Sequence, residues 1–163
     1  MTAIDMGCGS GIQTLNLLFA GAGKVIALDI NEKALETIAK NCGLAGFHGK
    51  IDARISDLFS ACNEKADLIV FNPPYLETEA KKFPDLDGGK MGRELLDRFL
   101  TEMPAHLNKG GKCYFLQTDL NGYAATERKI ESLGMELEVV ARKRLFFEEL
   151  TVYRCWRREM KSF

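Results

Sequence analysis

The sequence predicts an α/β domain of three layers, in which a mainly parallel β-sheet is covered by helices on both faces. Short apolar runs alternate with amphipathic helical patterns along the whole chain, and alternation at these lengths is typical of parallel sheets. The chain has 163 residues, of which 46% are hydrophobic. This suits one domain with one sizeable core, so we expect residues 1–163 to form a single domain.

Seven segments have the character of strands. The apolar runs that predict the first five cover residues 2–6, 25–28, 50–55, 66–71 and 113–118. Two further strands, near 136–144 and 149–156, are separated by a short connection. We expect these last two to pair antiparallel, because so short a connection can join only antiparallel neighbours.

Helical patterns fill the connections between the strands. The first helix is expected to carry an apolar side made of Ile12, Leu15, Leu18 and Phe19 and to end at the glycines that follow. Asn31 is a good cap for the second helix. The third should run from about Leu96 to Leu107, interrupted or kinked near Pro104, and the fourth should cover about 122–133.

Composition excludes several classes of protein. The formal charge of −1 and the pI of about 6.2 disfavour a protein that holds nucleic acid through phosphates. No apolar stretch approaches the ~20 residues that span a bilayer, and no secretory signal is recognisable. Five scattered cysteines favour reduced thiols and a cytoplasmic protein. With only His48 and His106 available, we expect no metal site.

The turn after the first predicted strand contains three glycines, Gly7, Gly9 and Gly11. Glycine allows a tight turn and a close approach of ligand to backbone, and the helix that follows offers free N–H groups to an anion. A dinucleotide fingerprint would place its third glycine five residues after the first. Ile12 holds that position here, so the turn departs from the dinucleotide pattern.

Two carboxylates follow the next two strands. Asp29 lies 22 residues after Gly7, where it could accept hydrogen bonds from both hydroxyls of a ribose. Asp57 could accept from an adenine amino group while Leu58 packs on the purine. The alternatives are a solvated strand-end carboxylate for Asp29 and a simple helix cap for Asp57. Taken with the glycine turn, the two residues predict a nucleoside site.

The segment Asn72-Pro73-Pro74-Tyr75 directly follows the strand predicted over 66–71. Ligands of open α/β sheets bind at the carboxyl ends of strands. Proline has no backbone N–H, and the Asn72 side-chain oxygen with the Pro73 carbonyl could hold a planar NH2 group beneath the Tyr75 ring. The alternative is a turn that merely ends the strand. Our hypothesis is a site for an amide or an exocyclic amine.

In these motifs the chain resembles the class I S-adenosylmethionine-dependent methyltransferases. Residues 5–11 look like their first motif, Asp29 like their ribose-binding acid, Asp57 with Leu58 like their adenine-contacting pair, and residues 72–75 like their amino-methylating motif. The resemblance implies a Rossmann-like methyltransferase fold, with a seven-stranded, mostly parallel sheet that has one antiparallel strand near the C-terminus. It implies S-adenosyl-L-methionine as cofactor, bound by Asp5, Gly7, Cys8, Gly9, Gly11, Asp29, Ile30, Asp57, Leu58 and Asn72.

Residues 86–99 add a narrower resemblance, to the HemK/PrmC family, which methylates the glutamine amide of the GGQ loop in class 1 peptide-chain release factors. The match is best to the short archaeal and eukaryotic branch. The resemblance implies protein-glutamine N5-methylation with Asn72, Pro73 and Tyr75 as catalytic residues. The residues that it places on the substrate are Asn72, Pro73, Pro74, Tyr75, Gly89 and Arg93.

Two further expectations come from the same family. Its short branch works with a small zinc-binding activator protein, which we expect at the edge strand over 50–55, because exposed sheet edges need protection. Family members also carry a segment before the first strand, and here Met1 lies almost on that strand. We therefore expect the usual covering segment to be missing.

Two other functions remain open. N6-adenine methylation of RNA or DNA would use the same acceptors, with Tyr75 stacking on a flipped base, and the basic run Arg142-Lys143-Arg144 is compatible with it. The other alternative is a non-catalytic cofactor-binding subunit.

Overall fold

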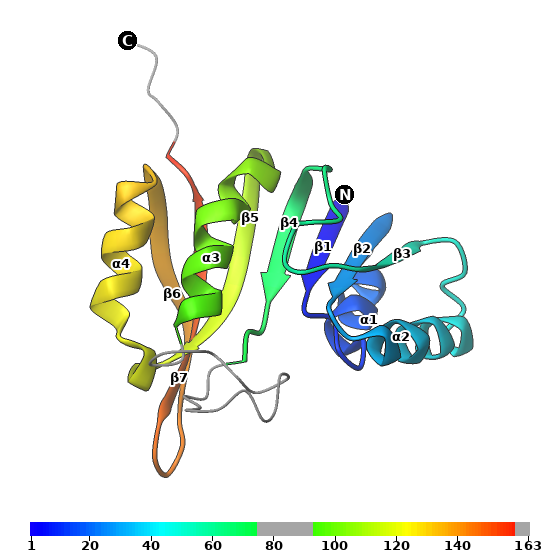
Figure 1. Cartoon of the computed structure of the whole chain (residues 1–163), viewed down its shortest axis with the longest axis horizontal. Helices are drawn as coiled ribbons and strands as arrows, with labels where there is room; N and C mark the ends of the chain where they lie inside the picture. Colours follow the sequence, from blue (N-terminus) through cyan, green and yellow to red (C-terminus); the bar gives the residue numbers. More distant parts are fainter. Residues whose placement is uncertain (75–92, 159–163) are drawn as a thin grey trace. The chain divides into compact units, whose positions relative to one another are not determined.

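The computed structural model describes residues 1–74 and 93–158 and divides into two compact units (Figure 1). The first unit comprises Met1–Phe71 and Ala105–Gly111, and the second comprises Asn72–Pro104 and Lys112–Phe163. Strands and helices alternate along both, so the predicted α/β class is confirmed.

Four parallel strands form the sheet of the first unit. Their order is β3 (Ile51–Ile55), β2 (Lys24–Asp29), β1 (Thr2–Met6) and β4 (Ala66–Phe71). All four strands were predicted from the sequence to within one or two residues at each end. Because the strands are parallel, their carboxyl ends meet at one edge, and the loops that leave this edge carry the predicted site residues.

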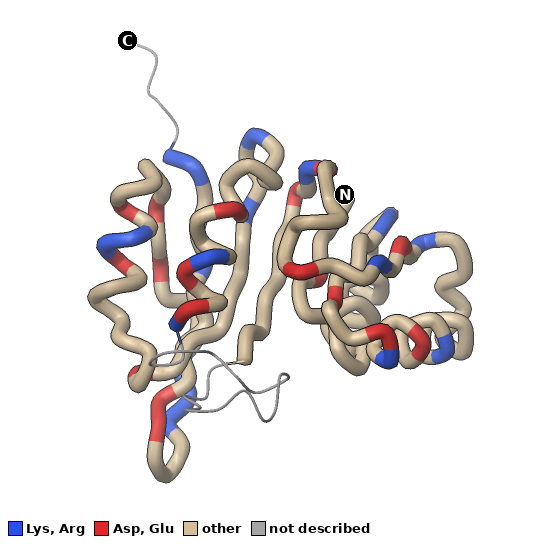
Figure 2. Tube along the Cα trace, viewed as in Figure 1, with Lys and Arg blue, Asp and Glu red and all other residues tan. Residues whose placement is uncertain are grey.

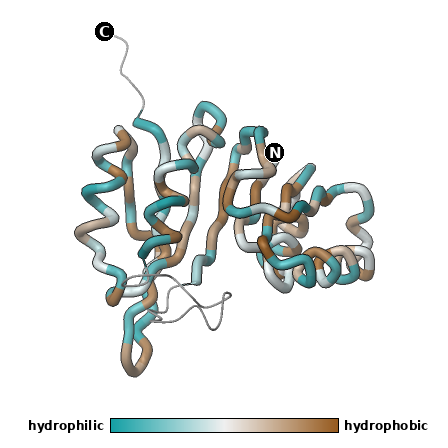
Figure 3. The backbone as a smooth tube through the Cα atoms, viewed as in Figure 1, coloured by the Kyte–Doolittle hydropathy of each residue, from teal (hydrophilic) through white to brown (hydrophobic). Residues whose placement is uncertain are grey.

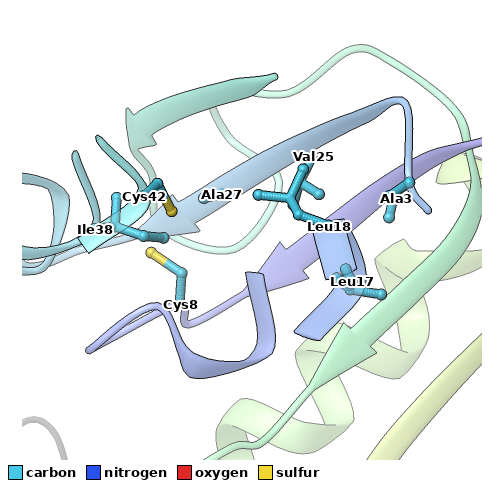
Figure 4. Packing of buried hydrophobic residues seen from close by; sticks show 9 residues of the cluster. Ala3, Cys8, Leu17, Leu18, Val25, Ala27, Ile38 and Cys42 are labelled. Carbon is cyan, nitrogen blue, oxygen red and sulfur yellow. The ribbon is translucent and has the colours of Figure 1, made fainter. Parts of the chain in front are cut away.

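Helices α1 (Ile12–Phe19) and α2 (Glu32–Leu44) pack on one face of this sheet. Ala3 and Val25 are register partners on neighbouring strands, and they share a core with residues of both helices, which Figure 4 shows at close range. The helix residues of this core are Leu17, Leu18, Ile38 and Cys42. The opposite face carries Ile4, Ile26, Leu28 and Ile69, which are also buried, so neither face of the strands is left to solvent.

The apolar side predicted for α1 is correct for Leu15 and Leu18 and wrong for Ile12 and Phe19. Ile12 and Phe19 are exposed, whereas the buried residues of the helix are Thr14, Leu17 and Leu18. The reason is a hydrogen bond of 2.6 Å from the Thr14 hydroxyl to the buried Asp5 carboxylate, which turns the threonine side of the helix toward the sheet. The cap predicted for α2 is confirmed, since the Asn31 side chain accepts from the backbone N–H of Lys33.

Three antiparallel strands form the sheet of the second unit. β5 (Leu107–Thr118), of which residues from Lys112 onward belong to this unit, pairs with β7 (Glu149–Arg157), and β7 pairs with β6 (Met135–Arg144). β7 runs against both of its neighbours. It is therefore the antiparallel strand that the resemblance implies, and it brings the total to seven strands.

Among its described residues the second unit has the helices α3 (Glu94–Glu102) and α4 (Tyr123–Ser132), with short 3-10 turns at Met103–His106 and Asp119–Asn121. The predicted interruption near Pro104 is confirmed, because α3 ends at Glu102. Leu107, which the sequence assigns to the helical pattern, instead begins β5. Pro104 lacks the N–H that an α-helix needs, so the last residues tighten into a 3-10 turn and the chain leaves the helix early.

Gly11 allows α1 and α2 to approach one another closely. Its φ is +81°, and a Cβ atom at this position would lie 2.4 Å from Cγ1 of Ile38, which belongs to the core of Figure 4. Real Cβ atoms do not approach other atoms this closely. The third glycine of the turn is therefore required by helix packing as well as by backbone conformation.

We expect Gly11→Ala to lower the free energy of unfolding by roughly 2–5 kcal/mol, because backbone strain and overpacking add at this site. Gly46→Ala is the matched control, since Gly46 has a φ of +79° but no atom within 4 Å of the added Cβ. Urea unfolding of the two variants separates strain from steric clash. Equal losses in both would show that the contact with Ile38 carries no cost.

Candidate functional site

The turn between β1 and α1 is fastened to the end of the neighbouring strand. The backbone N–H groups of Gly7 and Cys8 both donate to the carbonyl of Leu28, at 2.7 and 3.1 Å. The N–H of Gly11 then donates to the carbonyl of Cys8 at 2.8 Å and closes the turn. Gly7, Gly9 and Gly11 all have positive φ, so the turn depends on a conformation that other residues rarely adopt.

Asp29 ties this turn to the loop after β2. One of its carboxylate oxygens accepts from the N–H of Gly9 and the other from the N–H of Asn31, each at 2.8 Å. A carboxylate oxygen has two lone pairs, so each can still accept one further bond, for example from a ribose hydroxyl. The two backbone bonds fix the orientation of the carboxylate before any ligand arrives.

Asp5 lies beneath the turn and is only 2% exposed. Burial raises its pKa to about 6, partly offset by hydrogen bonds from the side chain and the backbone of Thr14. The charge of Asp29 also raises this pKa by a smaller amount. This buried carboxylate of β1 holds the start of α1 in place through Thr14 and adds negative charge close to the predicted site.

Cys8 is unsuited to nucleophilic chemistry. Its side chain is buried, and burial together with the charges of Asp5 and Asp29 raises the pKa of the thiol to about 12. The thiolate is the reactive form of cysteine, so Cys8 contributes to the site through its backbone and its bulk. All five cysteines of the chain are free and buried.

The loop after β3 is tied to the same edge of the sheet. The N–H of Ser56 donates to the carbonyl of Asp29 at 2.8 Å. Leu58 has a φ of +48°, and the Ser56 hydroxyl stabilises this unusual conformation by donating to the Leu58 carbonyl at 2.6 Å. Strained residues that the surrounding structure holds in place often lie at binding sites. Asp57 is exposed and Leu58 is buried.

These residues meet the requirements of a nucleoside ligand. A Cβ atom on Gly9 would have only a backbone oxygen of Gly7 near it, at 3.9 Å, among the described residues, so a ligand can approach the turn closely. Asp29 offers oriented acceptors, and Ile30 next to it is 65% exposed, which gives an apolar surface for a base. The residues present therefore fit S-adenosylmethionine.

The segment predicted to hold the methyl acceptor begins immediately after β4. Asn72 is exposed, Pro73 is buried and Pro74 is half-buried. Tyr75 and Gly89 lie outside the described residues. Fixed proline φ angles stiffen the chain at this point, and the exposed Asn72 amide is available to a ligand at the carboxyl end of the strand.

Arg93 is held by the second unit. Its guanidinium donates to the carbonyl of Asn121 at 2.8 Å, to the hydroxyl of Thr126 at 2.8 Å and to the carboxylate of Asp97 at 2.5 Å. The side chain is buried. These contacts give Arg93 a role in joining α3 to α4, and its predicted contact with substrate stays a prediction.

Sequence reasoning missed two residues that shape the site, Thr14 and Ser56. Each is a small hydroxyl residue whose role depends on a hydrogen bond, to Asp5 and to the Leu58 carbonyl respectively. The sequence around Thr14 gives no indication of such a hydrogen bond, since the residue is a lone threonine in a helical pattern. The sequence around Ser56 gives a weak indication, because a serine next to a strand end commonly forms a hydrogen bond to nearby backbone.

The family model "Methyltransferase small domain" matches residues 1–147. A protein of Methanocaldococcus jannaschii, named as a candidate protein N5-glutamine methyltransferase, is 39% identical over 160 residues, which is 94% of this chain and 80% of that protein. Human methyltransferase HEMK2 is 28% identical over 82% of this chain and 67% of its own length.

Two further comparisons agree with these. The release factor glutamine methyltransferase of Cereibacter sphaeroides is 32% identical over 68% of this chain and 44% of its own length. A solved chain of the Mtq2–Trm112 complex of E. cuniculi, described as responsible for methylating the termination factor eRF1, superposes with a TM-score of 0.76. It covers 96% of this chain and 85% of its own, at 24% identity, which supports the fold.

We expect the burial of Asp5 to make stability depend on pH in an unusual direction. Because the folded pKa of about 6 lies above the ordinary value of 3.8, the native state binds more protons than the unfolded state between these pH values, and this group lowers stability as pH rises through them. Asp5→Asn should therefore gain stability relative to the wild type between pH 4 and pH 6, by up to about 3 kcal/mol. Urea unfolding at several pH values measures this difference.

Asp52→Asn is the control of opposite sign. Hydrogen bonds from Arg54 and Lys24 lower the pKa of Asp52, so its contribution to stability is present above pH 4 and is lost as pH falls below it. A difference between Asp5→Asn and the wild type that stays constant from pH 4 to pH 7 would contradict the raised pKa of Asp5.

Proposed function

This chain belongs to the methyltransferase small-domain family, and we propose that it transfers the methyl group of S-adenosylmethionine to the amide nitrogen of a glutamine in a peptide-chain release factor. The observation that carries this proposal is the exposed Asn72 followed by buried Pro73 at the end of β4. An amide acceptor of this kind suits a planar nitrogen. The 39% identity to a relative named for N5-glutamine methylation supports the choice of a protein amide.

The cofactor would be held by the edge of the first unit. Asp29 would accept from the ribose hydroxyls, since its orientation is already fixed by Gly9 and Asn31. The turn from Gly7 to Gly11 would accommodate the part of the cofactor nearest the backbone, with Cys8 buried beneath it. When bound, S-adenosylmethionine would supply a sulfonium methyl group that a nitrogen can attack, with the neutral thioether as the leaving group.

The adenine would lie between two features of the same edge. Ile30 offers an exposed apolar side chain, and Asp57 offers an exposed carboxylate for the amino group. Leu58 is buried in a strained conformation, so it would shape the wall of the site through its backbone more than through its side chain.

Asn72 and Pro73 would prepare the glutamine amide for methyl transfer. The amide nitrogen is a poor nucleophile, because its lone pair is delocalised into the carbonyl. If the Asn72 side-chain oxygen and the Pro73 carbonyl each accept one N–H, the lone pair turns out of the plane toward the methyl group, and positive charge that develops on nitrogen is stabilised. Pro74 and Tyr75 would enclose the amide and exclude water, with Gly89 and Arg93 supporting the substrate segment.

N6-adenine methylation is the second candidate, because an exocyclic amine could occupy the same acceptors. The formal charge of −1 speaks against tight binding of nucleic acid. A non-catalytic cofactor-binding subunit is the third candidate.

No helix in the described part of the chain is long and apolar enough to cross a membrane.

A small zinc-binding activator is the proposed partner. Within the sheet of the first unit β3 is an edge strand, since it pairs with β2 on one side, and Ile55 at its end is exposed. Arg54 holds this edge rigid by donating to both Asp52 and Glu64. The structural neighbour of E. cuniculi is itself a two-protein complex, which supports a partner for this chain.

The function is tested by offering a purified release factor, its glutamine-substituted variant and RNA to the enzyme with labelled methyl donor. We expect incorporation only into the release factor that retains the glutamine. Asn72→Ala should lower turnover at least about a hundredfold, since it removes an acceptor from the transition state. Cofactor binding, measured by calorimetric titration, should change little.

Asp29→Ala is the complementary variant. It should weaken cofactor binding, because it removes the proposed ribose acceptors and the bonds that hold Gly9 and Asn31. Near-normal turnover of Asn72→Ala, or methylation of RNA in preference to the release factor, would reject the proposed role of Asn72 or the proposed substrate.

The partner is tested by mixing the chain with a small zinc-binding activator. We expect a one-to-one complex with faster methylation than the chain alone, because the partner would cover the β3 edge. Ile55→Lys should weaken the complex, and Leu44→Lys, which changes an exposed residue of α2, should not. Full activity of the isolated monomer, unchanged by the activator, would contradict the proposal.

A further inference from the structure

Two phenylalanines stand at the apex of the β6–β7 hairpin, in the second unit. Phe146 is 101% exposed and Phe147 is 94% exposed, so neither ring is covered by the described part of the chain. Figure 3 shows the hydrophobic tip of this hairpin, between more polar strands. Exposed apolar groups of this size commonly mark an interaction site.

The turn that carries them does not require phenylalanine. The N–H of Leu145 donates to the carbonyl of Glu148 at 2.8 Å, which makes Phe146 and Phe147 the two central residues of a tight hairpin turn. Neither residue has a positive φ, and small polar residues such as asparagine, aspartate and serine are the common choice in turns. Burial of each ring would be favourable, and none of this gain is realised in the free chain. Folding therefore gives no reason for two aromatic rings here.

The base of the hairpin is fixed. The hydroxyl of Tyr123 lies 3.0 Å from the carbonyl oxygen of Glu149 and 2.8 Å from the hydroxyl of Thr151. The N–H of Glu149 donates to the carboxylate of Asp119 at 3.0 Å, directly after the carboxyl end of β5. Because its base is held, the hairpin presents its apex with little loss of conformational entropy on binding.

Basic side chains lie immediately behind the apex. Arg142 is engaged within the hairpin base, with its guanidinium 5.9 Å from the centre of the Tyr123 ring and 3.9 Å from the Glu149 carboxylate. Lys143 and Arg144 are exposed and have no acidic partner among the described residues. Figure 2 shows the charged residues along the strands of the hairpin. The apex is thus apolar with a free positive charge beside it.

We infer that this apex, residues 143–147, docks on the release factor outside its glutamine loop, with the two rings in an apolar pocket and the basic pair facing acidic residues at the rim of that pocket. The inference rests on the proposed function. An acceptor pair such as Asn72 and Pro73 distinguishes only an amide, whereas selection of one glutamine in one protein needs an interface of ~1,000 Å² or more. Aromatic anchors in pockets carry much of the energy of such interfaces.

Nucleic acid is a poorer occupant of the same surface. Glu148 and Glu149 follow the phenylalanines, so the segment from Arg142 to Glu149 has a net charge of only +1, from three basic and two acidic residues. Binding through phosphates depends on several basic contacts. A protein pocket with a modest acidic rim matches the apex better.

The test combines Phe146→Ser with Phe147→Ser, which removes both rings and requires no positive φ, in keeping with a turn in which neither phenylalanine has one. We expect the KM for the release factor to rise at least about thirtyfold, as befits two lost aromatic anchors, while kcat at saturating release factor and the affinity for S-adenosylmethionine stay within about twofold. The single variants Phe146→Ser and Phe147→Ser should each give part of the effect. Circular dichroism checks that all of them fold.

Matched controls separate the apex from general surface changes. Leu44→Ser removes an exposed apolar residue from α2 and should leave the KM unchanged. Lys143→Glu with Arg144→Glu should raise the KM and reduce its dependence on salt, because attraction to an acidic rim is screened by ions. Lys40→Glu, an exposed charge reversal on α2, should do neither.

Binding of the release factor to the wild type and to the apex variants, measured by titration without methyl donor, separates this inference from the proposed function. Tight binding that the apex variants lose supports docking even if no methyl group is transferred, a result that would defeat only the proposed function. If the wild type methylates the release factor and the apex variants do so with the same KM, the docking inference is overturned and the proposed function stands. The docking inference is also overturned if the apex variants lose kcat and affinity for S-adenosylmethionine as strongly as they lose release-factor binding. It is overturned as well if the apex variants lose RNA binding while their KM for the release factor stays unchanged.

Discussion

The carboxylate of Asp29 is the interaction on which the loops at the carboxyl edge of the first unit's sheet depend. It accepts from Gly9 in the turn after β1 and from Asn31 in the loop after β2, while its backbone carbonyl accepts from Ser56 in the loop after β3. One residue thus fixes three successive loops at one edge of a parallel sheet. Charge-assisted hydrogen bonds to backbone N–H groups are among the stronger ones in proteins, and a ligand that adds bonds to the same oxygens meets a carboxylate that no longer has to be oriented.

The buried Asp5 shows what this arrangement costs. A carboxylate that is 2% exposed loses hydration, and the hydrogen bonds from Thr14 compensate only in part, since the pKa is still raised to about 6. A leucine at this position would avoid the penalty, but it would also remove the acceptor of the buried Thr14 hydroxyl. The acid is thus part of the contact that sets the buried face of α1.

The features that could be predicted from the sequence are those encoded by local pattern. The strand ends, the Asn31 cap and the antiparallel β7 follow from runs of a few residues and from short connections. The exposure of Ile12 and Phe19 on α1 could not be predicted from the apolar pattern. A tertiary hydrogen bond from Thr14 to Asp5 determines which face of the helix is buried. For the same reason the fixing of three loops by Asp29 is invisible in the sequence, although the residue itself was correctly placed at the end of β2.

Arg93 shows how a single buried cation can join several elements of the second unit. A guanidinium has five N–H donors, and that of Arg93 uses them on the Asn121 and Gly122 carbonyls, the Thr126 hydroxyl and the Asp97 carboxylate. Thr126 passes the network on by donating to the buried Gln117 at the end of β5. Lysine could not replace this arrangement, since a single ammonium cannot span four acceptors in one plane. The network joins α3, α4 and β5 within the second unit, and α4 provides the Tyr123 hydroxyl that anchors the hairpin carrying Phe146 and Phe147. The hydrogen bonds of Arg93 and the contact of Tyr123 with the hairpin thus meet at the start of α4, where Asn121, Gly122 and Tyr123 are consecutive in the sequence.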